Sequence, residues 1–435
     1  MIRGGDRPLR ALTRLLRSAD LARAFTIAAL GTGFASFLIE RTAGSVTHAT
    51  IVTGLVVVGL AILIARRDEF ALLRFAPTSL VAFLAWTLAS VVWSFDESST
   101  FTGWIGLLAW GFLALVVAHV RDTLQTVRAL GDVLRWLLAL SLGVEILSGV
   151  LLDMPFPFLG VAGDIAYGGP VQGVFGTRNM LGLVAIIALV TFAIEWLTQS
   201  ISVQLSVFSL TLAGLLAVLS ASPTALVVGV AVLAAMLALI VVRRVRPSRR
   251  RAAQWALATV VVVVLAACYA LRHRIIRLLD AASDFSTRAD LWNEILEWVR
   301  HRPVQGWGWH GTWWDEPYPL SVINFRLDDR HGSALNAYFD VLIQAGWAGL
   351  LLFGTLCAVA MVRSWLVAGE RRSVVYAWTP LMLVILLVDS VFESFTLSGL
   401  GWMMLVLCTV RAGQSRSWRE RIRDVAEGPA PSPLS

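Results

Sequence analysis

The chain has 435 residues, of which 57% are hydrophobic and 15% are charged, with a formal net charge of +7. Soluble domains carry roughly 25% charged residues, so this is not the composition of a soluble globular protein. All of the basic residues except the histidines are arginines, and most of them cluster between apolar runs. Such clusters are typical of membrane topology signals and lipid headgroup contacts, and they do not indicate a nucleic acid partner.

The apolar runs are long enough to cross a bilayer, which requires about 20 mostly apolar residues per helix. They lack the alternation of ~10-residue strands that marks a transmembrane barrel. The sequence therefore predicts an all-α fold, a polytopic transmembrane bundle of about twelve helices with a large extracytoplasmic loop that carries short helices. The twelve segments cover approximately residues 22–40, 47–65, 76–94, 101–120, 130–151, 178–197, 203–221, 223–242, 253–271, 341–363, 374–390 and 396–411.

Arginines at both termini and in alternate loops predict that both termini are cytoplasmic. The expected regions are a basic N-terminus, nine helices, the large loop, three helices and a Pro/Ser-rich, disordered tail. They cover residues 1–20, 21–271, 272–340, 341–411 and 412–435.

The loop over residues 272–340 is the one region polar and long enough to hold soluble chemistry, and we expect it to form a folded cap. It contains a predicted helix, DLWNEILEWV at 290–299, and glycines at 306, 308 and 311 that permit sharp turns. Its tryptophans could stack on sugar rings or form an aromatic belt near the lipid headgroups. They are Trp292, Trp298, Trp307, Trp309, Trp313 and Trp314.

Two arginines of the outer side are candidates for binding an anion. Arg178 and Asn179 follow a glycine-rich turn in GVFGTRNMLG, at the start of a predicted helix, where free N–H groups and a guanidinium suit a phosphate. An interfacial arginine that snorkels to water is an equally good interpretation. Arg288 lies in the first turn of its helix, where the helix dipole disfavours a cation and an anionic partner is expected. A salt bridge to Asp290 or Glu294 is the alternative.

The segment RHGSALNAYFDVLIQAGWAGLLLF at 330–353 places His331 just before a predicted helix, at the outer interface. Histidine is the usual general base near neutral pH, although a lone histidine more often has a structural role. Carboxylates inside apolar segments are costly and are functional candidates. Asp389 and Glu393 lie at the outer end of the eleventh segment, and Glu145 and Glu195 lie within the fifth and sixth.

No metal site, disulfide framework or cofactor is expected from the sequence. The three cysteines lie in apolar runs without paired spacing and are Cys268, Cys357 and Cys408. No glycine-rich nucleotide motif is present.

In their order, the polar segments resemble the O-antigen ligase and O-antigen polymerase superfamily of polytopic membrane glycosyltransferases. The pattern is an arginine followed by Leu-Trp, then Pro-x-x-Gly-x-Gly, then a histidine with a downstream leucine, and Gly-x-x-Gly at the start of a helix. The resemblance covers the second half of the chain well, and the first half only in hydropathy. The matching positions are Arg288, Leu291, Trp292, Pro303, Gly306, Gly308, His331, Leu335, Gly346 and Gly349.

The resemblance implies an undecaprenyl-diphosphate-linked glycan as donor and a reaction at the outer face of the inner (cytoplasmic) membrane, metal-independent and inverting. It implies that His331 activates the acceptor hydroxyl and that Arg288 holds the diphosphate. A second family arginine is missing from SASPTALV at 220–227, so Arg178 is its substitute on physical grounds. Gln344 stands where many relatives have a glutamate. Asn179, Asn336, Asp389 and Glu393 are supporting candidates.

Several alternatives stay open at this level. A polysaccharide polymerase of the same superfamily has the same pattern, and the acceptor could be a glycan, a lipid or a protein. A transporter or flippase for lipid-linked glycans would instead show charged residues at the midplane and repeat symmetry, and neither is clear in the sequence. Asp340, Asp389 and Glu393 are the candidates for a carboxylate that partners His331.

Overall fold

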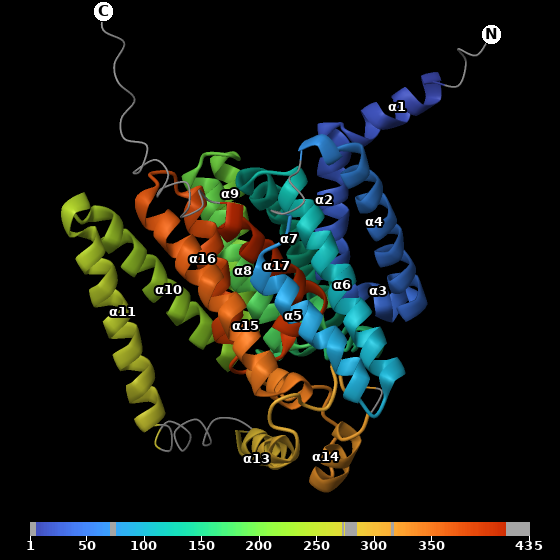
Figure 1. Cartoon of the computed structure of the whole chain (residues 1–435). Coiled ribbons are helices and arrows are strands. Elements are labelled where there is room, and N and C mark those ends of the chain that lie inside the picture. Colours follow the sequence, from blue (N-terminus) through green and yellow to red (C-terminus); the bar gives the residue numbers. More distant parts are fainter. Residues whose placement is uncertain (1–5, 70–74, 272–273, 275–284, 315–316, 415–435) are drawn as a thin grey trace, which may run out of the picture.

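The computed structural model describes residues 6–69, 75–271, 274, 285–314 and 317–414 (Figure 1). Within these residues all regular elements are helical, and the only β-bridge is an isolated pair between Phe156 and Val161. The predicted all-α class is confirmed. The helices are α1 Asp6–Leu16, α2 Ala19–Phe34, α3 Ser36–Ala43, α4 Ser45–Ala65, α5 Thr78–Ala89, α6 Glu97–Val120, α7 Thr123–Ile146, α8 Arg178–Leu197, α9 Val203–Leu219, α10 Pro223–Arg244, α11 Pro247–Ala270, α13 Phe285–His301, α14 Leu320–Leu327, α15 Ala337–Glu370, α16 Val375–Asp389 and α17 Gly399–Gln414.

Short helical turns connect some of these helices. They are η1 Arg67–Glu69, η3 Ser90–Trp93, the π-helical η4 Leu147–Leu152, η5 Pro157–Leu159, η6 Asp164–Tyr167, η7 Gly173–Phe175 and η8 Phe395–Leu397.

In the described part of the chain, six helices are long and apolar enough to cross a membrane. They are α4, α6, α7 extended by η4, α8, α10 and α15. The pair α2 and α3, bent by 74°, would make a seventh span, and α5 with η3, α9 and α16 are shorter apolar helices. A polytopic helical architecture is therefore confirmed, whereas the predicted number of about twelve spans is not.

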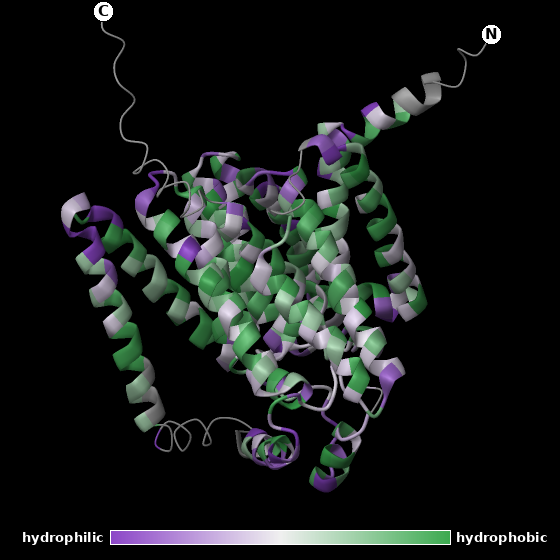
Figure 2. Cartoon of the chain, in the orientation of Figure 1, coloured by the Kyte–Doolittle hydropathy of each residue, from purple (hydrophilic) through white to green (hydrophobic). Residues whose placement is uncertain are grey.

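The bundle has two chemically different ends. At one end, arginines cap the last carbonyl groups of neighbouring segments: Arg17 donates to Ala65, Arg128 to Ser200 and Arg411 to Arg121. The helices α13 and α14 lie at the opposite end (Figure 1). Figure 2 shows hydrophobic residues along the middle of the helices and hydrophilic residues gathered at both ends. This is the distribution expected for helices that cross an apolar layer.

A small apolar core attaches the cap, residues 285–336, to the bundle. Leu291 and Ile295 of α13 and Ile323 of α14 are fully buried and pack in one cluster with Trp313 and with Ile343 of α15. The predicted helix at 290–299 is thus the central part of α13, and its apolar face is the face that packs on α15.

The helix α15 is broken at Gly346, which has φ +67° and ψ −172°. The backbone of Pro303–Gly308 lies in the break: Trp307 N donates to Ile343 O (3.1 Å), Gly308 N to Gln344 O (2.9 Å) and Trp347 N to Pro303 O (2.8 Å). A break in an apolar helix leaves backbone N–H and C=O groups without partners unless other protein groups supply them. The Pro-x-x-Gly-x-Gly and Gly-x-x-Gly segments are therefore two halves of one junction.

Candidate active site

A polar network at the cap end joins four elements that are far apart in the sequence. Arg288 of α13 donates to Glu393 Oε1 (3.2 Å) and to the carbonyl oxygen of Phe392. Asn179 of α8 donates to the same Glu393 oxygen (2.7 Å), and Ser222, the N-cap of α10, donates to Asn179 Oδ1 (2.7 Å). The anionic partner that the position of Arg288 requires is therefore Glu393.

The alternative pairing of Arg288 with Asp290 or Glu294 is wrong. Glu294 instead accepts from Arg326 (2.7 Å) and from Trp298 Nε1 (3.0 Å). Glu393 is only 6% exposed, and burial raises its pKa, whereas the neighbouring Arg288 and Asn179 oppose this rise. Burial disfavours the charged carboxylate, so Glu393 depends on its cationic partner.

Arg178 differs from Arg288 in having no partner. It is the first residue of α8 and is exposed, and its side chain forms no hydrogen bond or ion pair with another described residue. Thr177 caps the helix by accepting from Met180 N (3.1 Å). Arg178 is thus the first residue of α8, one position before Asn179 of the Asn179–Glu393 pair.

The turn that carries His331 is held at its backbone. Asn324 of α14 accepts from His331 N (3.2 Å) and donates to His331 O (3.1 Å). Arg288 Nη1 reaches Leu335 O, 3.4 Å away, so the same guanidinium touches the His331 turn and Glu393.

The carboxylate nearest to the His331 ring is Asp329, whose Oδ2 lies 3.5 Å from Nε2. The ring is buried (7% exposed), and within the described residues neither ring nitrogen forms a hydrogen bond, so the contact with Asp329 is an ion pair only when the imidazole is protonated. None of the three carboxylates that we considered as partners, Asp340, Asp389 and Glu393, forms a contact with His331 in the described structure. Asp329 was visible in the sequence two positions before the histidine, but its exposed, loop-like setting gave no reason to select it.

Asp340 and Gln344 of α15 hold the backbone of the cap through hydrogen bonds. Asp340 accepts from Ala334 N (3.0 Å) in the His331 turn, from Trp313 Nε1 (2.7 Å), and from Ser394. Gln344 donates to Asp340 (3.2 Å), and its oxygen accepts from the backbone N–H groups of His310 (2.8 Å) and Gly311 (2.9 Å). A glutamate at this position would set two carboxylates against each other, so the amide of Gln344 suits its neighbour.

A second buried histidine of the cap is poorly suited to act as a base. His310 is 5% exposed, and its Nδ1 lies 3.2 Å from Ser99 Oγ and 3.3 Å from Thr100 Oγ1 at the start of α6. Burial lowers the pKa of His310 to about 4. A base with so low a pKa accepts a proton weakly at neutral pH.

The remaining candidates fall into two groups. Asn336 is the N-cap of α15, where it accepts from Tyr338 N (2.9 Å) and Phe339 N and donates to Val391 O (2.9 Å). Asp389 is 1% exposed, and in the described part of the chain neither of its oxygens has a hydrogen-bond partner. Asn336 thus has a clear local structural role, whereas the fold supplies no role for the Asp389 carboxylate.

The two carboxylates of the predicted fifth and sixth segments have structural partners away from His331. Glu145 accepts from Gln172 N (3.0 Å) and Gly173 N (2.8 Å), which fixes the turn before α8. Glu195 pairs with the buried Arg135, which also donates to Ser209 (2.8 Å).

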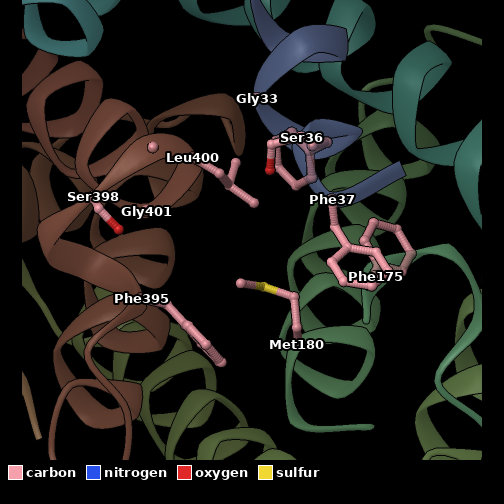
Figure 3. Close-up of a pocket in the computed structure, with 11 residues that line it drawn as sticks. Gly33, Ser36, Phe37, Phe175, Met180, Phe395, Ser398, Leu400 and Gly401 are labelled. Atoms are coloured by element: carbon pink, nitrogen blue, oxygen red, sulfur yellow. The ribbon is translucent and has the colours of Figure 1, made fainter. Parts of the chain in front are cut away.

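An apolar recess lies beside the polar network. It is lined at the α2–α3 bend, at the start of α8 and around η8 and the start of α17. Figure 3 shows Met180 and Leu400 projecting into the recess, with Phe37 and Phe395 at its rim. Met180 follows Asn179, and Phe395 lies two residues after Glu393, so the recess adjoins the groups that surround Arg288. In the described residues, no group of three or more His, Cys, Asp and Glu side chains is arranged to hold a metal ion.

Comparison with protein families gives one match, over residues 207–354, to the family described as O-antigen ligase. This match covers less than half of the chain. No curated protein matches the chain. The O-antigen ligase segment begins in α9 and ends in α15, so it includes Arg288, the cap, His331 and both halves of the Gly346 junction. The resemblance to the O-antigen ligase and polymerase superfamily is thereby confirmed.

The O-antigen ligase segment does not contain the whole polar network. Asn179 and Glu393 lie outside the matched residues, yet they contact each other and, through Glu393, Arg288. The fold brings them to the segment from α8 and from the end of α16.

Proposed function

We propose that this protein is a membrane glycosyltransferase that transfers a glycan from undecaprenyl diphosphate to an acceptor hydroxyl at the outer face of the cytoplasmic membrane. The observation that carries the proposal is that Arg288, inside the O-antigen ligase segment, contacts both the His331 turn and Glu393. A cation and a candidate base therefore share one small region, next to an apolar recess.

In this proposal, the donor binds at the network. Arg288 and the unpaired Arg178 hold the diphosphate, with Asn179 as a further donor of hydrogen bonds. Guanidinium groups bind phosphate oxygens through charge-assisted hydrogen bonds, and the N-terminus of α8 adds its dipole. The polyprenyl tail begins in the recess lined by Met180 and Phe395.

The reaction is a displacement at the anomeric carbon of the donor. The acceptor oxygen forms a bond to this carbon on the face opposite the diphosphate, the bond from carbon to phosphate oxygen breaks, and the configuration inverts. His331 takes the acceptor proton through Nδ1, and Asp329 at Nε2 stabilises the imidazolium, as in other histidine–carboxylate pairs. The arginines stabilise the charge that develops on the leaving diphosphate, so the residues perform the reaction without a metal.

The same proposal orients the chain. The arginine-rich end of the bundle, with both termini, faces the cytoplasm, and the cap faces outward. If the bent pair α2–α3, the shorter helices α5, α9 and α16, and the helices α11 and α17 also cross the membrane, the number of spans is about twelve. The partners are the lipid-linked glycan donor, a glycan, lipid or protein acceptor, and the membrane lipids.

A strain that lacks the protein tests the function. Complementation with the wild-type chain restores the envelope glycan, whereas His331→Ala does not, although it reaches the membrane in normal amounts. His301→Ala is the matched control, because His301 is exposed in α13 and outside the network. Loss of attachment to an acceptor in the deletion strain indicates a ligase, and loss of chain length indicates a polymerase. Full restoration by His331→Ala would refute the assigned role of this histidine.

A further inference from the structure

The cap displays one open indole ring. Trp314 is 68% exposed, whereas its neighbour Trp313 is fully buried. The other tryptophans of the loop, Trp292, Trp298, Trp307 and Trp309, are buried or partly buried. Trp314 forms no hydrogen bond with another described residue and stacks on no other described aromatic ring. Most of the Trp314 side chain is therefore accessible to a ligand.

Trp314 rests directly against the turn that carries the candidate base. Trp313 N donates to Gly332 O (3.0 Å). A Cβ atom at Gly332 would lie 2.5 Å from ring atom Cε2 of Trp314 and 2.9 Å from Cη2, so only a glycine allows this contact. Gly332 is the residue after His331. The open indole and the imidazole are therefore carried by adjoining backbone.

The same region supplies polar groups that suit a sugar. Asp329 is half-exposed (52%), and its Oδ2 lies 3.5 Å from the His331 ring. A pyranose has an apolar face of C–H groups, which is attracted to the negative face of an aromatic ring, and a rim of hydroxyl groups, which donate to carboxylates. Arg326, Asp328 and Arg330 of the same segment are also exposed, so the segment offers both donors and acceptors for sugar hydroxyl groups.

We propose that Trp314 is a platform that binds the pyranose ring of a carbohydrate acceptor and presents one of its hydroxyl groups to His331. This inference rests on the proposed function and narrows it: the acceptor is a sugar, and not a protein hydroxyl or a simple lipid. Trp314 binds and orients the acceptor, and it takes no part in bond breaking.

Saturation-transfer NMR on the purified full-length protein tests the platform without any reaction. The probes are the methyl glycosides of glucose, galactose and mannose, with acyclic sorbitol as the control for hydroxyl groups alone. We expect at least one pyranoside to receive saturation, most strongly at its ring C–H protons, and sorbitol to receive none. Trp314→Ala should weaken the binding roughly ten-fold, equivalent to about 1.4 kcal/mol, and Trp314→Phe should retain most of it.

Two further variants make the result specific. Trp255→Ala removes an indole of equal exposure (68%) from α11 and should leave the signal unchanged. His331→Ala should also retain the signal, because stacking does not require the base; a failure of catalysis is thereby distinguished from a failure of the platform. Equal signals from the pyranosides and sorbitol, or an unchanged signal in Trp314→Ala, would overturn the inference.

Discussion

At the scale of residues, the central feature of the site is the ion pair between Arg288 and the buried Glu393. Glu393 is buried, and Arg288 is the one guanidinium that contacts it in the described structure. A buried charge whose partner is removed destabilises a protein strongly, whereas replacement of both charges is often nearly neutral. Arg288 therefore has two roles that substitutions can separate, one in stability and one in binding the donor.

Arg288→Gln should lower the free energy of unfolding by up to about 3 kcal/mol, because Glu393 loses its cation. The double variant Arg288→Gln/Glu393→Gln should recover most of this stability but none of the glycan transfer. Thermal unfolding in detergent and a transfer assay measure the two effects. Arg326→Gln is the control, because the Arg326–Glu294 pair is more exposed (53% and 16%) and should contribute little. Transfer by the double variant would exclude Arg288 as the diphosphate ligand.

The sequence identified single residues better than their partners. Arg288, Asn179 and Glu393 were selected for separate reasons, but 214 positions separate Asn179 from Glu393, and no local pattern predicts that pairing. Ser222 and Asp329 were missed because a serine before a helix and an exposed aspartate are common in any protein. Sequence patterns indicate which charged residues lie in an unfavourable position. Only the fold shows which residue pairs with each of them.

At the scale of elements, the junction between the cap and α15 holds the site in place. The backbone of residues 303–308 fills the break at Gly346, and Gly306 and Gly346 approach so closely that a Cβ on Gly346 would lie 2.7 Å from Gly306 N. The sequence predicts a helix here, and the family resemblance places a Gly-x-x-Gly pattern at its start. It could not reveal the break, because the partner strand of backbone comes from a different segment.

Gly346→Ala should lower the free energy of unfolding by about 1–3 kcal/mol from backbone strain at φ +67° alone. The collision of its Cβ with the inserted backbone should add to this loss. The control is Gly354→Ala in the same helix, where a Cβ meets nothing within 4 Å and alanine favours the helix. Unfolding temperature and the yield of folded protein measure both. Equal stability of the two variants would show that the junction is not a rigid part of the fold.

At the scale of the whole molecule, apolar runs and arginine clusters were sufficient to predict a polytopic helical bundle with a polar cap. They were less reliable for the number of spans, because α2 and α3 bend sharply and α5, α9 and α16 are short. The candidate active site lies at the end of the bundle that carries the cap. Arg288 of the cap pairs with Glu393 just after α16, and the starts of α8 and α10 join this pair beside the apolar recess.

The most direct test is transfer by the purified full-length protein in liposomes, with an undecaprenyl-diphosphate-linked glycan and a membrane extract that contains the acceptor. Undecaprenyl diphosphate should be released in step with the glycan that is transferred. A positioned base contributes about 10²–10⁴-fold to a rate. His331→Ala should therefore slow the transfer of glycan and the release of undecaprenyl diphosphate by about 100-fold or more. Transfer without release of undecaprenyl diphosphate, or an undiminished rate in His331→Ala, would contradict the proposed mechanism.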